Sequence, residues 1–264
     1  MVIIGERINS TNKNVADALE KKDESYIRKL AVEQADAGAD YIDVNAGTFA
    51  EEEADLLVWL VKTVQAAVSR PCCIDSPNSR AVAKALEVHQ GQALINSLTF
   101  EKDKCEKLIP LVRDHRAKVV SLCLGEKGIP ATYDERFRVA VEMIDLLCRK
   151  GVQPQDIYVD PLIQPIAVSP SAAAIALEVI GRVKQSFPDT HTIGGISNIS
   201  FGMPLRPVIN AAFLAMAVAR GLDTAILNPC DPYIRSAVLA SEALAERDAH
   251  GIRFISAFRK GKIT

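Results

Sequence analysis

Short β-branched runs alternate with longer segments of helical periodicity from one end of this 264-residue chain to the other. The runs predict eight strands, at Val2–Ile8, Ala39–Asn45, Pro71–Asp75, Ala93–Thr99, Lys118–Leu124, Ile157–Leu162, Thr192–Ser197 and Thr224–Asn228. Apolar residues spaced three and four apart predict amphipathic helices at Ser25–Ala37, Ala54–Val68, Ser79–His89, Lys102–His115, Glu135–Lys150, Ala172–Gln185, Val208–Arg220 and Tyr233–Arg247. Such alternation predicts parallel pairing, because each helix returns the chain to the edge where the next strand starts.

Eight strand–helix units are the number that closes a parallel sheet into a barrel, and about 250 residues is the usual length of that fold. An open doubly wound sheet is the alternative, but it usually has about five or six strands and a glycine-rich GxGxxG turn after the first. The segment GERINSTN, which follows the first expected strand, has no such turn. We therefore predict a single-domain α/β protein, a (β/α)8 TIM barrel that spans residues 1–264.

The composition limits the kinds of partner. Hydrophobic residues make up 48% of the chain and charged residues 24%, and the net charge of −2 gives no basic excess for nucleic acid or a membrane surface. Acidic Glu6 directly follows a short apolar start, and no run reaches the roughly 18 apolar residues of a membrane span, so we expect a cytoplasmic protein. The six cysteines form no CxxC pair and most lie in apolar runs, which predicts buried free thiols. We expect the last residues, 253–264, to be a solvated tail or edge.

Carboxylates and carboxamides stand at the carboxyl ends of nearly all the predicted strands, where the active site of a barrel lies. These residues are Glu6, Asn9, Asp43, Asn45, Asp75, Asn96, Asp160, Asn198 and Asn228. The fifth strand is the exception and ends in Leu122 and Leu124. The four histidines, His89, His115, His191 and His250, lie elsewhere.

This set of residues predicts neither a catalytic metal site nor a Ser–His–Asp triad, because both need ligands or a histidine at the mouth. A ring of Asp and Asn suits a flat heterocycle, since an ionised Asp accepts hydrogen bonds and Asn both donates and accepts them. The alternative is that these residues cap helices and turns, and Asp43, Asn45 and Asn228 keep that interpretation. Asp75 and Asp160 directly end apolar strands, as CCIDS and IYVDP show, and Asn96 has the same setting in ALINS, so we expect all three to face a pocket.

Several segments together carry a resemblance to a known family. They are IIGERIN (3–9), DYIDVNAG (40–47), CIDSPN (73–78), ALINS (93–97), GIP (128–130), DIYVDPLI (156–163) and GGISNISFGMPLRPVINAAFLAMAVARGLD (194–223). In this order they resemble the pterin-binding methyltransferases of the methyltetrahydrofolate:corrinoid type. That group includes the partner of the corrinoid iron–sulfur protein in acetogens and the folate domain of cobalamin-dependent methionine synthase.

The resemblance implies roles for individual residues. Asp75, Asn96 and Asp160 match residues that hold the pterin by hydrogen bonds. Asn198 matches the asparagine that reaches toward N5, the atom that carries the methyl group, and it is the residue we expect to act in catalysis.

Three further residues fall on family motifs. Arg206 matches an arginine near the substrate, and Glu6 and Asp43 match motif positions whose role is less defined. Phe201 departs from the acetogen enzyme, which has a polar residue there, and is closer to methionine synthase. Because of this departure, the resemblance does not define the contacts beyond the pterin head or the identity of the partner protein.

The resemblance implies the transfer of a methyl group between 5-methyltetrahydrofolate and the cobalt(I) of a corrinoid protein. Tetrahydrofolate is the other form of the folate substrate. The stretch from Asp189 to Gly194 matches the DxHxxG pattern of corrinoid ligation, but it leads directly into a predicted strand rather than following one. We interpret it as coincidence and expect the corrinoid, a cobalamin, on a partner protein. The family also implies a homodimer.

Two alternatives stay open at this point. A dihydropteroate synthase shares the barrel and the pterin pocket, but INSTNKN lacks its aspartate–serine–phenylalanine loop and NPCDPY lacks its arginine–histidine pair. A non-catalytic folate-binding subunit of a corrinoid complex would bind the pterin without transferring the methyl group.

Overall fold

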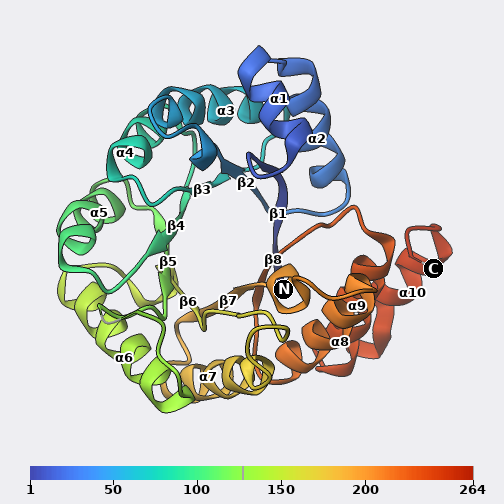
Figure 1. Cartoon of the computed structure of the whole chain (residues 1–264). Helices are drawn as coiled ribbons and strands as arrows, with labels where there is room; N and C mark the ends of the chain where they lie inside the picture. Colours follow the sequence, from blue (N-terminus) through green and yellow to red (C-terminus); the bar gives the residue numbers. More distant parts are fainter. Residues whose placement is uncertain (127, 264) are drawn as a thin grey trace.

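The computed structural model describes residues 1–126 and 128–263. Within them, eight parallel strands close into a barrel in the order β1 to β8, and β1 pairs with β8 (Figure 1). The strands are β1 (Val2–Asn9), β2 (Tyr41–Asn45), β3 (Cys72–Asp75), β4 (Leu94–Leu98), β5 (Lys118–Leu122), β6 (Ile157–Asp160), β7 (His191–Gly195) and β8 (Thr224–Leu227). The predicted (β/α)8 fold is confirmed.

The helices form a ring outside the strands (Figure 1). The eight predicted ones appear as α2 (Glu24–Asp36), α3 (Glu53–Ala67), α4 (Ser79–Val88), α5 (Lys102–Asp114), α6 (Tyr133–Arg149), α7 (Ala172–Ser186), α8 (Arg206–Ala219) and α9 (Pro232–Leu244). Short 3-10 turns lie at η1 (Gly47–Phe49), η2 (Pro154–Asp156), η3 (Ile196–Ser200) and η4 (Ala249–Gly251). Aliphatic side chains between the strand and helix layers form the large core.

Two helices were not predicted. Helix α1 (Lys13–Lys21) buries only Val15, Ala18 and Leu19, so its periodic signal is short within a polar stretch. Helix α10 (Ile252–Arg259) packs on α9 and buries only Ala257, so the segment expected to be a solvated tail or edge, residues 253–264, begins as a largely exposed helix. The apolar spacing of α10 was too brief to register as a helix.

The inside of the barrel is closed by a layer of its own. It consists of one residue from each of the first seven strands: Ile4, Tyr41, Cys73, Leu94, Val120, Tyr158 and Ile193. Ile226 of β8 packs against this layer. The barrel is therefore a filled core rather than a channel, and any ligand has to bind above the layer.

Two further expectations concern buried free thiols and the absence of a membrane-spanning segment. Cys72, Cys73, Cys105 and Cys123 are buried free thiols as predicted, but Cys148 is exposed and Cys230 is half-buried. None of the helices in the described part of the chain combines the length and apolar character needed to span a bilayer.

Candidate functional site

A cavity of about 750 Å³ lies at the carboxyl ends of the strands, within the usual size range of small-molecule sites. Its lining includes every residue that the sequence analysis assigned to the site: Glu6, Asp43, Asp75, Asn96, Asp160, Asn198 and Arg206. The structure therefore brings together residues that are up to 200 positions apart in sequence.

The strand period explains how these residues meet. Side chains on a strand alternate between its two faces, so the residue two positions further along points the same way. Two positions beyond the apolar layer stand Glu6, Asp43, Asp75, Asn96, Leu122, Asp160 and Gly195, and all of them line the cavity. Asp75 pairs in register with Asn96, and Leu122 with Asp160. The cavity floor is thus a polar ring that lies directly on the apolar layer.

The most deeply buried member of the ring is Asp43. Its side chain is almost fully buried, and one carboxylate oxygen has no hydrogen-bond partner among the described residues. Burial raises the pKa of Asp43 well above its usual value, and the neighbouring charge of Asp75 raises it further. A buried oxygen without a hydrogen-bond partner costs free energy. This carboxyl can therefore either hold a proton or accept a hydrogen bond from a ligand.

Asp75 and Asp160 share this character. Burial raises the pKa of Asp75 to about 6, although Asn45 donates a hydrogen bond to its carboxylate at 3.0 Å. Burial raises the pKa of Asp160 to about 7, opposed by the backbone N–H of Leu162, which lies 2.8 Å from Oδ1. Neither forms an ion pair with any described residue. Carboxyls with raised pKa values in a cleft are typical of functional sites.

A second group of contacts fixes the segment that carries Asn198. Glu6 accepts a hydrogen bond from the Ser197 hydroxyl at 2.9 Å. The Arg206 guanidinium donates to the Ser197 carbonyl at 2.8 Å and to the Ser200 hydroxyl at 3.1 Å. Burial raises the pKa of Glu6, while Ser197 and Arg206 act in the opposite direction. The hydrogen bonds of Arg206 in this structure therefore hold η3.

Asn198 lies in η3, past the end of β7, and its side chain is exposed at the cavity. The side chain folds back over Gly195: a Cβ at Gly195 would lie 3.0 Å from Asn198 Nδ2. Such a distance is tighter than ordinary contacts, so a larger residue at position 195 would push the carboxamide away.

Other strand-end asparagines have local structural roles. Asn9, Asn45 and Asn228 each accept a hydrogen bond from the backbone N–H two residues further along, which stabilises the turn there. The side chains that cap helices are Asn12, Asp23, Asn78, Thr132 and Asp231. The capping interpretation of Asp43 is wrong, because its side chain lies in the ring and no helix begins at it.

No described histidine lines the cavity, and the part of the chain that the structure describes holds no group of three or more His, Cys, Asp or Glu placed to bind a metal ion. His191 of the DxHxxG stretch begins β7 and stacks on Tyr158 with ring centroids 4.6 Å apart. Both positions precede the ring on their strands, so His191 lies at the opposite end of the barrel from the cavity.

Two residues that support the site, Ser197 and Arg136, were not predicted from the sequence. Ser197 gave no signal apart from its place in the SN pair. Arg136 did carry one, because it occupies the buried stripe of α6 with Ala140, Met143 and Leu147. A charged residue at an apolar position of an amphipathic helix indicates a buried polar contact.

A filled (β/α)8 barrel with a ring of carboxyls and carboxamides at its mouth defines a protein built to hold a small polar heterocycle. The chain belongs to the pterin binding enzyme family, whose profile matches residues 5–228. The family membership predicted from the sequence is thereby confirmed.

Two relatives give the family more detail. The chain is 34% identical over 265 residues to the methylcorrinoid:tetrahydrofolate methyltransferase of Eubacterium limosum, with 100% of this chain and 98% of that protein covered. It is 28% identical over 241 residues to the methionine synthase of Mycobacterium tuberculosis, which covers 86% of this chain but only 20% of that protein.

Solved structures share the fold. The dihydropteroate synthase from Xanthomonas albilineans in complex with 7,8-dihydropteroate superposes with a TM-score of 0.67 at 16% identity, over 92% of each chain. The same enzyme in complex with indole-2-carboxylic acid and 6-chloroguanine gives a TM-score of 0.70 at 16% identity. At this identity the likeness shows the barrel fold alone.

Proposed function

We propose that this chain is a methyltransferase that moves a methyl group between N5 of 5-methyltetrahydrofolate and the cobalt of a corrinoid protein. The observation that carries the proposal is the polar ring at the cavity floor, whose carboxyls Asp75 and Asp160 form no ion pair among the described residues. The full-length similarity to a protein named methylcorrinoid:tetrahydrofolate methyltransferase supports the reaction.

The ring matches the hydrogen-bonding edge of a pterin. The pterin presents an amino group and a ring N–H beside acceptor nitrogens and a carbonyl. Asp75 and Asp160 would accept from the N–H groups in their ionised form, and Asn96 between them in the ring would both donate and accept. Because the site is buried, each of these bonds is stronger than it would be in water.

Asn198 would act at the other edge of the ring system. When the methyl group leaves, the C–N5 bonding pair stays on N5 and N5 takes up a proton, while a bond forms between the methyl carbon and cobalt. The corrinoid on the partner protein supplies the nucleophile, a cobalt(I) centre. A hydrogen bond from the Asn198 amide that strengthens as charge develops at N5 would lower the barrier by about 2–4 kcal/mol.

An apolar rim beside Asn198 supports a protein partner at the mouth. Val168, Phe201 and Leu205 are exposed by 73%, 65% and 77%. The two loops that carry them approach each other, since a Cβ at Gly202 would lie 3.8 Å from Ala167 Cβ. Exposed apolar side chains gathered next to a cavity are typical of a docking surface. The homodimer stays a prediction, for which the exposed apolar residues of α10, Ile252 and Phe258, offer a surface.

The test is the absorbance of cobalt(I) in a mixture of protein, methyltetrahydrofolate and a reduced corrinoid protein or free cob(I)alamin. We expect the cobalt(I) band to be replaced by that of methylcobalt, with slower conversion by Asp75→Ala and Asn198→Ala variants. A chain that binds tetrahydrofolate but leaves the spectrum unchanged would be the non-catalytic folate-binding subunit. A chain that binds no folate would contradict both interpretations.

A further inference from the structure

Arg136 is a buried cation without an anionic partner. Its side chain is 1% exposed and is among the largest fully buried side chains of the protein. Among the described residues, no carboxylate lies within 4.0 Å of its guanidinium nitrogens. Burial of a charge is unfavourable unless hydrogen bonds replace its water, so the surroundings of this guanidinium have to satisfy it.

Neutral oxygen atoms of two loops at the barrel mouth do so. Arg136 Nε donates to the Pro130 carbonyl at 3.1 Å, in the loop between β5 and α6. Its Nη1 donates to the carbonyls of Pro161 and Leu162 at 3.0 and 2.6 Å, in the loop after β6. Its Nη2 donates to Oε1 of Gln164 in the same loop. One guanidinium therefore ties two loops that follow neighbouring strands, β5 and β6, to helix α6.

These contacts lead directly to Asp160. Leu162, whose carbonyl accepts from Arg136, donates its own N–H to Asp160 Oδ1 at 2.8 Å. Leu162 has a φ of 61°, in the left-handed region that a leucine rarely adopts. Strained backbone of this kind persists only where several contacts fix it. A second contact is Ile163, which packs so closely over Gly194 that a Cβ there would lie 2.4 Å from Ile163 Cδ1.

The charge of Arg136 acts on the same carboxyl. Burial raises the pKa of Asp160, and the Leu162 N–H and the positive charge of Arg136 oppose the increase. Among the described residues, Cys123, directly after β5, also interacts electrostatically with Asp160, and burial raises the pKa of its thiol. Arg136 is thus the cation that favours the ionised form of Asp160.

We propose that Arg136 is a positioning residue of the pterin site, which fixes the loop after β6 and keeps Asp160 in place and ionised as an acceptor for the ring N–H groups. The inference rests on the proposed function, because the ligand it concerns is the pterin. It assigns to a residue of the helix layer a part in binding at the mouth.

The experiment measures the tetrahydrofolate dissociation constant between pH 6 and pH 9 for the wild type and three variants. Arg136→Met removes the charge and the hydrogen bonds, and Arg136→Lys keeps the charge but loses the planar fork. Arg138→Met, on the exposed face of the same helix, is the matched control. We expect Arg136→Met to weaken binding about tenfold or more at pH 7, with less loss at pH 9 where Asp160 ionises without help. The dissociation constant of Arg136→Lys should lie between those of the wild type and Arg136→Met, and Arg138→Met should bind as the wild type does.

The pH dependence separates positioning from general damage to the fold, since a merely structural role would lower affinity equally at every pH. Equal losses from pH 6 to pH 9, or wild-type binding by Arg136→Met, would overturn the inference. If Arg136→Met does not fold, Arg136→Lys decides: about threefold or weaker binding at an unchanged melting temperature supports the inference, and unchanged binding overturns it. A wild type that binds no tetrahydrofolate would instead refute the proposed function.

Discussion

The two ends of this barrel use aspartate in opposite ways. At the mouth, Asp75 and Asp160 are half-buried without an ion pair among the described residues, and removal from water raises their pKa values to about 6 and about 7. At the base, Asp223 lies 3.1 Å from Lys184 and 3.2 Å from His191. Burial alone would raise the pKa of Asp223, but these partners outweigh it and leave the pKa below its usual value.

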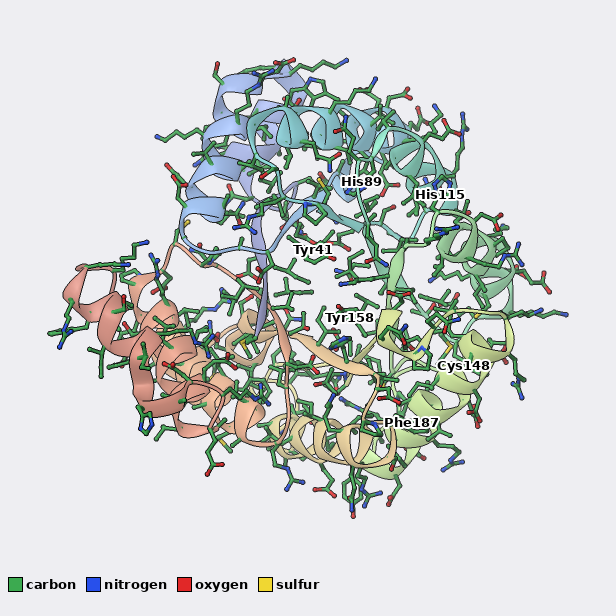
Figure 2. The ribbon with its side chains drawn as sticks, turned by 180° about the vertical axis from the view of Figure 1, so that it is seen from behind. Tyr41, His89, His115, Cys148, Tyr158 and Phe187 are labelled. Atoms are coloured by element: carbon green, nitrogen blue, oxygen red, sulfur yellow. The ribbon has the colours of Figure 1, made fainter. Side chains whose placement is uncertain are left out.

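The base is closed by aromatic and charged side chains that pack on one another. The ammonium of Lys118 lies 5.4 Å from the ring centroids of both Tyr41 and Tyr158, and His191 stacks on Tyr158. Figure 2, seen from behind, shows Tyr41 and Tyr158 inside the ring of strands, whereas His89 and His115 lie farther out. The base is thus organised for stability. The mouth keeps unmet hydrogen-bonding capacity, which a ligand can use.

The largest effect at the mouth is expected from Asn198→Ala. We expect methyl transfer to slow by about 100-fold or more, because a donor that acts in the transition state is removed. Tetrahydrofolate affinity should change by no more than about threefold, since the proposed contacts to the pterin edge come from other residues. Single-turnover rates and equilibrium titration measure the two quantities. Equal losses in rate and affinity would assign Asn198 to binding alone.

Asp160→Asn tests the mouth as a binding device. Loss of a charged acceptor for a ring N–H should weaken tetrahydrofolate binding by about 10- to 100-fold at pH 8. Asn keeps an oxygen for the Leu162 N–H, so the loop should stay in place. Asp223→Asn at the base is the control, and it should leave the affinity unchanged. Titration of both variants with tetrahydrofolate checks this prediction, and a weaker Asp223→Asn would break the division between the ends.

The same pair of variants should change stability in opposite directions. A carboxyl whose pKa is higher in the folded than in the unfolded chain holds more protons when folded. Its contribution to stability therefore falls as the pH rises from about 4 to about 7. Asp160→Asn should thus be more stable than the wild type at pH 8, by about 1–3 kcal/mol. Asp223 has a lowered pKa, so its stabilisation is present at neutral pH and is lost as the pH falls through its folded pKa.

Asp223→Asn should accordingly be less stable at pH 8 by about 1–3 kcal/mol, because the partners of the carboxylate lose its charge. Denaturant unfolding of both variants at pH 5 and pH 8 measures the two effects. A loss of stability in both variants at pH 8 would show that the ionised carboxyl of Asp160 does not destabilise the folded protein.

The smallest expected effect is a release of protons on binding. Asp75 and Asp160 are partly protonated in the empty site near pH 6.5, and ring N–H donors favour their ionised forms. Tetrahydrofolate binding should release about one proton or less at pH 6.5 and almost none at pH 8.5. Calorimetry in buffers of different ionisation enthalpy measures this number. Proton uptake at pH 6.5 would contradict the assignment of these carboxyls as ionised acceptors.

The sequence predicted the eight strands because their apolar residues obey a short period, but it placed the carboxyl ends of β5, β6 and β7 two residues too far along the chain. Asp75, Asn96 and Asp160 follow apolar runs, and the parallel topology brings such ends to one edge of the sheet. Asn198 was predicted for the site through the family resemblance, but its place in η3 past the strand depends on backbone turns that no period encodes. Arg136 could not be assigned, because its partners belong to two loops whose approach is a tertiary property.

The polar ring at the mouth also lacks symmetry, because β5 contributes Leu122 where its neighbours contribute Asn96 and Asp160. A perfectly even ring would accept a flat guest in several rotational settings of similar energy. An apolar side chain among polar ones makes these orientations unequal in energy. Only an apolar edge of the ligand can face it without losing hydrogen bonds. Leu122 would thus limit which edge of a bound heterocycle can be turned toward Asn198.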